Sequence, residues 1–374
     1  MTDLFVYGTL RSARLLAAVS GRDDLTSQDA TVSGYTVGAV AGDVVPFVKA
    51  DPDGACAGLL ITNIPADAMT RLDTYEGAFG YDLIDVEVLT SHGARQAKLY
   101  VPPADIAMAD HAWSLTDWCA NWETLAVYAA TELFRHDPPL SFDQIKAQWA
   151  GIQSRAWAKC IAQSGQHPTQ LRRTGAPEDI DLTLPHPPTG GFFRFEDAQL
   201  RARQFSGQMS DTMSREGFVG FDAGLLLPYD PVRDRVLLVE QVRMGAVMRE
   251  DPDPWLLEPV AGMIDPRESP QDCVLREGYE EAHLSNLTLH PVAKAYASPG
   301  ASSDFFHMFV GVCDLPDTHP RYGGLDAEGE DIRLHLISRS AALDLIRSNE
   351  INVTPLMTLL FWLELNKASL GYSA

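Results

Sequence analysis

The sequence predicts an α+β protein of two domains, and three observations lead to this expectation. The chain has 374 residues, and at roughly 150 residues per domain this length favours two domains. A polar, proline-rich stretch at 164–190 lacks sustained periodicity, which is typical of a linker. On each side of it, β-rich segments come first and helical periodicity follows. We therefore expect domains at 1–163 and 191–374.

In the N-terminal half, short β-rich runs are separated by Gly, Pro and Asp, which predicts strands joined by turns. The expected strands are 3–7, 31–37, 57–62, 85–89 and 97–101. From 109 to about 161, apolar residues recur at three- and four-residue spacing, which predicts helices. Ser141 followed by Gln144 is typical of a helix start.

In the C-terminal half, a hairpin is expected around Asp230-Pro231, between strands at 224–229 and 235–241. The other expected strands are 191–195, 198–205, 256–261, 293–297 and 305–314. Helices are expected at 269–282, 338–348 and 355–367.

Composition restricts the class of protein. With 45% hydrophobic and 21% charged residues, the chain is expected to fold into a globular protein. Because 51 Asp and Glu face only 29 Lys and Arg, nucleic-acid binding through a broad basic face is excluded. No apolar run approaches 18 residues, so we expect no membrane span.

The cysteines and the N-terminus indicate the compartment. The five cysteines are widely spaced and form no CxxC motif, so we expect reduced thiols rather than disulfides or a zinc site. The first residues, MTDLFVYGTL, lack the features of a secretory signal. A cytoplasmic enzyme is the expectation.

A spaced set of acids forms the strongest motif, Gly262-x5-Glu268-x7-Arg276-Glu277-x2-Glu280-Glu281. On a helix, positions 277, 280 and 281 share one face, so three carboxylates crowd together. A solvated acidic helix face is the simpler interpretation, but the glycine and glutamate before the helix favour a site for a hard cation such as Mg²⁺. Arg276 is positioned to orient one of the carboxylates.

This motif resembles the Nudix box, and 191–374 is similar to the ADP-ribose pyrophosphatase branch of the Nudix family. Six segments carry the likeness: SGQMS (206–210), PYDPVRD (228–234), LLVEQVR (237–243), PWLLEPVAGMI (254–264), ASPGASSD (297–304) and GLDAEGEDIRLHLISR (324–339). The resemblance implies a Nudix α/β/α sandwich. Two residues depart from the family pattern: Gly278 replaces a larger apolar residue, and His283 replaces a glycine.

The resemblance also implies the hydrolytic residues. Glu277 and Glu281 would bind Mg²⁺, with Glu280 assisting and the carbonyl of Ala261 completing the shell of two or three ions, for which Mn²⁺ is a substitute. In the late loop, the general base would be Glu328, with Glu330 as the reserve candidate; an ordinary solvated turn is the alternative there. The expected products from ADP-ribose are AMP and ribose 5-phosphate.

For substrate binding, the family uses a domain-swapped homodimer. The resemblance implies that Phe192 and Arg215 stack on the two faces of adenine and that Arg243 pairs with the diphosphate. A core aromatic is the alternative for Phe192.

In the first half, Tyr7-Gly8-Thr9-Leu10 follows the first strand, and backbone N–H groups in such a turn can bind an anion. Together with the pair Gly58-Leu59 and the segment LDTYEG at 72–77, this motif resembles the γ-glutamylcyclotransferase (AIG2-like) family over about 3–105. A small β-barrel with helices is the implied fold.

In that family the YGTL loop binds the γ-glutamyl group, and a glutamate matching Glu76 transfers the proton while the substrate amine attacks its own γ-carbonyl. The product is 5-oxoproline. The Tyr-x-Arg often found after that glutamate is replaced by Tyr81-Asp82-Leu83, which affects the choice of substrate. A surface acid beside a turn is the alternative for Glu76.

Three hypotheses remain. Both halves are enzymes; or only the Nudix half is catalytic, and the N-terminal half binds a ligand or organises a dimer; or the Nudix half cleaves another nucleotide sugar or dinucleotide.

Overall fold

The computed structural model describes residues 1–104, 106–165, 168–325 and 329–370. The chain divides into two compact units, which are described separately: 1–192 with 199–213, and 193–198 with 214–374. The predicted two-domain α+β fold is confirmed. The boundaries at 163/164 and 190/191 stay predictions.

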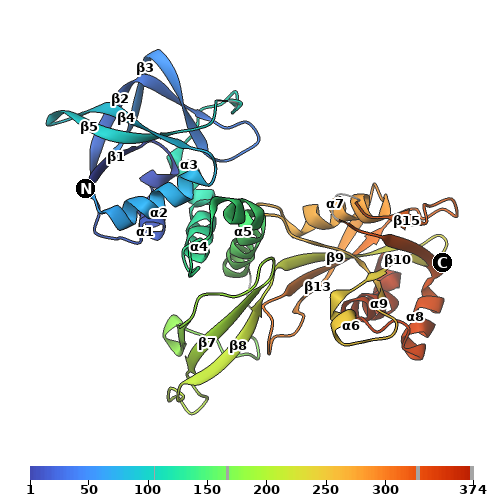
Figure 1. Ribbon diagram of the computed structural model, residues 1–374. Helices are drawn as coiled ribbons and strands as arrows, with labels where there is room; N and C mark the ends of the chain where they lie inside the picture. The colour runs from blue at the N-terminus through green and yellow to red at the C-terminus, as the bar shows by residue number, and fades with distance from the viewer. Residues whose placement is uncertain (105, 166–167, 326–328, 371–374) are drawn as a thin grey trace. The chain divides into compact units, whose positions relative to one another are not determined.

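The N-terminal unit contains a closed barrel in the order β1-β3-β2-β4-β5 (Figure 1). Its strands are β1 (Thr2–Val6), β2 (Thr26–Ala39), β3 (Pro46–Ile64), β4 (Asp82–Thr90) and β5 (Gly93–Val101). β1 pairs antiparallel with β3 and parallel with β5, which closes the barrel. Leu4 and Val6 pack toward the helices, whereas Phe5 and Tyr7 point into the barrel with apolar side chains from all five strands.

Helices pack against this barrel and against one another. They are η1 (Thr9–Arg11), α1 (Ala13–Ser20), α2 (Ala66–Gly77), α3 (Leu115–Asn121), α4 (Glu123–Leu133) and α5 (Phe142–Ser164). At the start of α5, Ser141 Oγ accepts the N–H of Gln144 and Gln144 Oε1 accepts the N–H of Ser141, which confirms the predicted helix start. Between α4 and α5 a buried ion pair forms, in which Arg155 Nη2 lies 2.6 Å from Glu132 Oε1.

The segment expected to be a linker is partly regular. It contains η2 (Pro177–Asp179) and β6 (Ile180–Thr183), and β6 pairs with the end of β7 (Arg194–Ala202). With β8 (Met213–Val219) they form a three-stranded sheet. One strand, β7, replaces the two that we expected at 191–195 and 198–205, because alternating side chains continue through the boundary between them.

The C-terminal unit is built on an eight-stranded mixed sheet in the order β13-β14-β9-β10-β16-β15, with β12 on β9 and β11 on β10. The strands are β9 (Asp222–Asp230), β10 (Arg235–Val242), β11 (Trp255–Glu258), β12 (Val260–Met263), β13 (Thr288–Tyr296), β14 (Phe305–Val312), β15 (Tyr322–Gly323) and β16 (Ile332–Ser338). The predicted hairpin forms between β9 and β10. The single strand expected at 256–261 is instead β11 and β12, which pair with different neighbours.

Two helical layers cover this sheet (Figure 1). The helices are α6 (Met244–Met248), α7 (Pro270–Ala282), α8 (Arg339–Ser348), α9 (Thr354–Asn366) and η4 (Lys367–Leu370). Leu225 and Leu227 of β9 pack with α9, whereas Leu226 between them packs with Val274 of α7. Alternate residues of one strand therefore serve opposite layers, and the predicted sandwich is confirmed.

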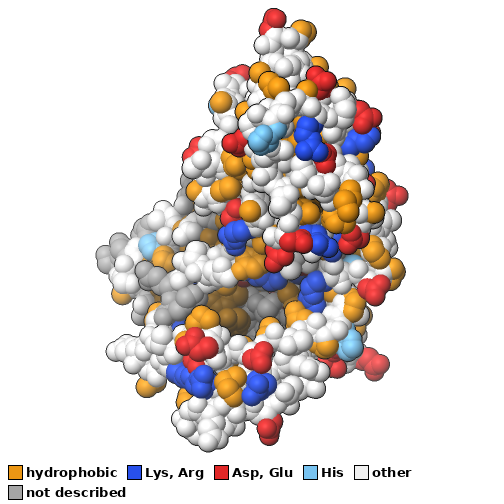
Figure 2. All heavy atoms as spheres, turned by 90° about the vertical axis from the view of Figure 1, so that its left-hand side faces the viewer, with side chains coloured by type: hydrophobic (Ala, Val, Ile, Leu, Met, Phe, Trp, Pro, Cys, Tyr) orange, Lys and Arg blue, Asp and Glu red, His pale blue; other side chains and the backbone are white. Residues whose placement is uncertain are grey.

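The surface, the cysteines and the helices can be compared with what the composition predicts. Acidic, basic and hydrophobic side chains are interspersed on the face drawn in Figure 2. All five cysteines are free, as predicted. Over the described residues, none of the helices combines the length and the apolar character needed to cross a membrane.

Candidate functional site

The acidic motif places its carboxylates on α7. Ser269 Oγ accepts the N–H of Asp272 at 3.1 Å, and Pro270 occupies the first turn, so the helix begins where the motif predicts. At its C-terminal end His283 adopts a left-handed conformation with φ of 54°. This explains why glycine is usual at the position.

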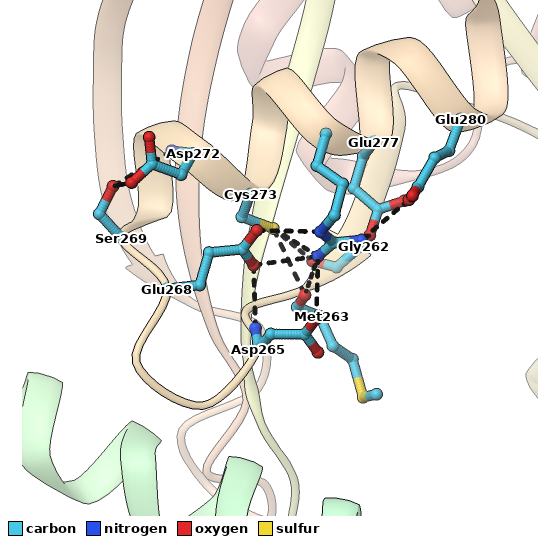
Figure 3. A network of polar contacts seen from close by, with 10 residues as sticks. Gly262, Met263, Asp265, Glu268, Ser269, Asp272, Cys273, Glu277 and Glu280 are labelled. Atoms are coloured by element: carbon cyan, nitrogen blue, oxygen red, sulfur yellow. Dashed lines mark hydrogen bonds and ion pairs between the residues drawn. The ribbon is translucent and has the colours of Figure 1, made fainter. Parts of the chain in front are cut away.

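Arg276 lies at the centre of the acidic side chains. Its Nε and Nη2 donate to Glu268 at 2.9 and 3.0 Å, and Nη1 donates to Glu277 at 2.6 Å and to Glu280 at 3.0 Å. Nη2 also donates to the carbonyl of Met263 at 3.0 Å. Figure 3 shows the three glutamates directed toward one another, from α7 and from the loop before it. The expected orienting role of Arg276 thus corresponds to a multidentate contact.

Two of the glutamates lie against the edge of β12. Glu281, 1% exposed, accepts the N–H of Ala261 at 3.0 Å. A Cβ at Gly262 would lie 1.7 Å from Glu277 Oε1, so only glycine leaves room for that carboxylate. The structure therefore brings Ala261, Glu277 and Glu281 together, and their role as metal ligands stays a prediction.

The donor set fits a hard divalent cation in its chemistry. Burial raises the pKa of Glu277 to about 7 against the effect of Arg276, and it raises the pKa of Glu281 to about 8, with Glu277 and Glu330 acting in the same direction. Enclosed, mutually repelling oxygen ligands are stabilised by a cation of this kind. Over the described ranges, however, no three His, Cys, Asp or Glu side chains are already arranged as a metal-binding group. Arg276 is instead hydrogen-bonded to three of the acids, Glu268, Glu277 and Glu280.

Glu330, the reserve candidate for the general base, lies near the same cluster. Glu330 raises the pKa of both Glu277 and Glu281 by its charge, so it lies near them. Its Oε2 accepts the N–H of Leu325 at 3.2 Å, which fixes the side chain across the base of the loop. Glu328, the expected base, lies outside the described residues.

A half-buried acid that the sequence reasoning missed, Glu258, holds Arg243. Arg243 follows β10, and its Nε donates to Glu258 Oε2 of β11 at 2.6 Å. Burial raises the pKa of Glu258 in spite of this cation. The charge of Arg243 also lowers the pKa of Glu281, which places Arg243 on the side of the acids. The sequence did contain a signal for this residue, because Glu258 is a charged residue within the otherwise apolar run PWLLEPVAG.

The two expected adenine-binding residues are exposed. The ring of Phe192 belongs to a residue that is 56% exposed, and its carbonyl accepts Nη1 of Arg155 at 2.6 Å within the N-terminal unit. Arg215 lies in β8, and its Nη1 donates to the carbonyl of Ser214. Phe192 is not a core aromatic, and the stacking of both residues on adenine stays a prediction.

Gly278, the other departure from the family pattern, is explained by packing. A Cβ at this position would lie 3.1 Å from methyl groups of Leu226 and Leu287, so α7 approaches the sheet closely there. The close approach offsets part of the cost of about 1 kcal/mol that a helical glycine carries.

A second candidate site lies in the barrel unit, where β1 ends. Tyr7 is 7% exposed, and after it Gly8 and Thr9 lead into η1 with Leu10 buried. The N–H of Arg11 donates to the carbonyl of Gly8 at 3.1 Å, which closes the turn. A Cβ at Gly8 would meet the ring of Pro46 at 2.8 Å, so the tight turn requires glycine.

Glu76 lies near the end of α2 and is surrounded by tyrosines. Burial raises its pKa to about 7. The charge of Glu76 in turn raises the pKa of Tyr7, Tyr75 and Tyr81, beyond the larger effect of their own burial. The structure therefore brings Glu76 to the YGTL turn, although the two motifs are more than sixty residues apart.

Neighbouring residues of the two motifs support this arrangement. The hydroxyl of Tyr100 donates to Asp73 at 2.5 Å, which ties α2 to β5. A Cβ at Gly58 would lie 2.4 Å from the carbonyl of Val6, so glycine permits β1 and β3 to approach closely.

Comparisons with known proteins match each unit separately. Residues 4–120 match the family model described as gamma-glutamyl cyclotransferase, AIG2-like, and residues 222–356 match the NUDIX domain model. The chain is 39% identical over 203 residues to an ADP-ribose pyrophosphatase of Escherichia coli K12, covering 54% of this chain and 96% of that protein. It is 34% identical over 198 residues to one of Haemophilus influenzae, covering 52% and 91% respectively.

A third relative is named for a different substrate. The chain is 28% identical over 150 residues to a GDP-mannose pyrophosphatase of Salmonella paratyphi B, covering 40% of this chain and 77% of that protein. Both resemblances seen in the sequence are confirmed by these matches.

Proposed function

The chain belongs to the Nudix family through its C-terminal half, and we propose that this half hydrolyses the diphosphate of ADP-ribose to AMP and ribose 5-phosphate. The observation that carries the proposal is that Arg276 holds Glu277 and Glu280 on the helix that also carries Glu281, whose carboxylate accepts the N–H of Ala261. Nudix hydrolases generally use divalent metal ions. Hydrolysis of a nucleotide sugar's diphosphate is the coarser activity that the relatives support.

Different residues of the chain have different roles in the proposed hydrolysis. Glu277, Glu281 and the carbonyl of Ala261 would hold two or three Mg²⁺ ions, with Glu280 assisting and Mn²⁺ as a substitute. Bound Mg²⁺ supplies charge neutralisation for the diphosphate oxygens and activates water. Arg276 keeps Glu277 and Glu280 in position before the metal binds.

The remaining hydrolytic roles belong to the late loop and to Arg243. A carboxylate of that loop, Glu328 or in its place Glu330, takes the proton of the attacking water. Arg243, held by Glu258 at 2.6 Å, pairs with the diphosphate. In a homodimer formed through the Nudix half, Phe192 and Arg215 stack on adenine.

We further propose a γ-glutamylcyclotransferase activity in the N-terminal half. Glu76, with its pKa raised to about 7, is suited to accept the proton of the attacking amine and to return it to the leaving nitrogen. The YGTL turn holds the γ-glutamyl group, and 5-oxoproline is released. The five free cysteines are compatible with the cytoplasmic location that we propose for the enzyme.

A substrate panel with the full chain tests the hydrolase. ADP-ribose, ADP-glucose, GDP-mannose, NAD and a diadenosine compound are compared at equal concentration with Mg²⁺ and with a chelator. We expect ADP-ribose to have the highest kcat/KM and the chelator to abolish AMP release. A higher kcat/KM for another member would replace ADP-ribose by that substrate.

A panel of γ-glutamyl dipeptides and γ-glutamyl amines tests the second activity by release of 5-oxoproline. No turnover of any member would favour the alternative, in which the barrel binds a ligand or organises a dimer without catalysis.

A further inference from the structure

Arg11 presents a buried donor that the chain itself leaves unpaired. Its Nε is shielded from solvent and has no hydrogen-bond partner in the described part of the chain. Its guanidinium also forms none of the ion pairs found among the described residues. Enclosing a charged group without an acceptor is costly, so such a donor calls for an explanation.

Other enclosed arginines of the same unit have acceptors. Arg71 donates from Nε to the carbonyl of Val19 at 2.7 Å and lies over the ring of Phe134. Arg155 pairs with Glu132 and with a backbone carbonyl. The unit therefore supplies partners to enclosed guanidinium groups, and Arg11 is an exception to this pattern.

Glu123, an acid whose charge acts on Cys119 together with that of Arg11, already has other partners. Glu123 accepts the hydroxyl of Ser12 at 2.5 Å and Nη1 of Arg14 at 2.8 Å. The residues directly after Arg11 thus use this carboxylate.

Arg11 is placed beside the candidate site of the barrel. Its N–H donates to the carbonyl of Gly8, so it lies one tight turn beyond the YGT segment. Its charge reaches into the barrel, because it lowers the pKa of Cys56, a residue that packs in the interior with Tyr7. Tyr7 is also close to the charge of Glu76. Arg11, whose Nε lacks an acceptor, and the carboxyl group of Glu76 therefore both lie near the part of the barrel that Tyr7 and Cys56 occupy.

We propose that Arg11 binds the α-carboxylate of the γ-glutamyl group, with Nε and an Nη donating to its two oxygens. This inference rests on the cyclotransferase activity proposed above for its choice of ligand. A carboxylate is the acceptor whose geometry matches the guanidinium fork, and it removes the cost of the unpaired donor. Because the α-carboxylate survives in the product, 5-oxoproline binds in the same way and needs no turnover.

Calorimetric titration of the full chain with L-5-oxoproline and with its α-carboxamide tests this role. The wild type should bind the acid at least tenfold more tightly than the amide, since a hydrogen bond to a charged group is of about that strength. Arg11→Gln should weaken binding of the acid at least tenfold and bring the preference for acid over amide close to one. Arg11→Lys should retain part of the preference.

Arg14→Gln is the matched control, because Arg14 lies three residues away with 60% of its side chain exposed and pairs with Glu123. It should leave both affinities unchanged. Circular dichroism establishes that each variant is folded. Failure of the wild type to bind 5-oxoproline, or an unchanged preference in folded Arg11→Gln, overturns the proposal.

The role of Arg11 and the cyclotransferase activity fail in different experiments. Arg11-dependent binding without turnover of any γ-glutamyl compound refutes the cyclotransferase and leaves Arg11 as the carboxylate anchor of a binding module. Turnover that Arg11→Gln leaves unchanged in KM refutes the role of Arg11 and leaves the cyclotransferase intact.

Discussion

Glu76 of the barrel and Glu281 of α7 are both enclosed carboxyl groups with a raised pKa, yet their surroundings differ. Glu281 accepts a backbone N–H and lies among other acids that Arg276 holds in place. For Glu76 the described residues provide no ion pair, and tyrosines surround it. The first environment suits carboxylates that a bound cation would keep ionised as its ligands, and the second suits a group that gains and loses a proton.

The largest effect is expected from a substitution in the proposed metal site, which should affect only the hydrolase activity. Glu281→Gln should lower kcat for AMP release from ADP-ribose by about 10³-fold, because an enclosed ligand charge is lost. Release of 5-oxoproline by the same preparation should not change. Tyr279→Phe is the control on the same helix, since Tyr279 is 67% exposed. Near-full AMP release by Glu281→Gln would contradict the metal assignment.

A substitution of Glu76 in the N-terminal unit should affect only the cyclotransferase activity. Glu76→Gln should lower 5-oxoproline release by about 10²-fold or more, because the amide cannot accept the amine's proton. AMP release serves as the internal control and should stay at the wild-type rate. If 5-oxoproline release persists at the original rate, the proton transfer belongs to another group.

The pH dependence of 5-oxoproline release distinguishes a proton acceptor from a fixed charge. Burial raises the pKa of Glu76 to about 7, so the basic form is populated above that value and is lost below it. We expect kcat/KM to fall about tenfold per pH unit below an apparent pKa near 7. Rates measured from pH 5 to 8 check this, and a flat profile through that range would be incompatible with Glu76 as the base.

Local sequence patterns were sufficient for the elements that carry these residues. The spacing of the acids predicted the face of α7, and Ser141 with Gln144 predicted the start of α5, because both depend on residues within one or two helical turns. The hairpin of β9 and β10 was predictable for the same reason, since its turn lies between the paired strands.

Features that depend on distant partners were not predictable. The division of 256–261 between β11 and β12 depends on which strand each piece meets in the sheet. Glu258 was missed because its importance arises from its hydrogen bond with Arg243, and Arg11 because its buried Nε lacks an acceptor. Neither feature leaves a pattern in the local sequence. β6 was missed since its pairing partner, β7, lies beyond the segment in which it occurs.

The smallest expected effect concerns how the two glutamate-bearing helices end. After α2 the chain continues through Ala78 at φ of −59°, whereas α7 ends at His283 at φ of 54°, a conformation that costs a non-glycine residue roughly 1–2 kcal/mol. His283→Gly relieves this cost, but it loses the bond from His283 Nε2 to the carbonyl of Tyr322 and adds freedom to the unfolded chain.

The net result should be a stabilisation of about 0.5 kcal/mol, seen as a rise of about 1–2 °C in the Tm of the transition that ADP-ribose binding shifts. Asn286→Gly, at φ of 58°, is the matched control and should change less, because asparagine tolerates this conformation better than histidine does. A lower Tm for His283→Gly would mean that the bond to Tyr322 outweighs the backbone cost, and that His283 anchors the end of the carboxylate helix to β15.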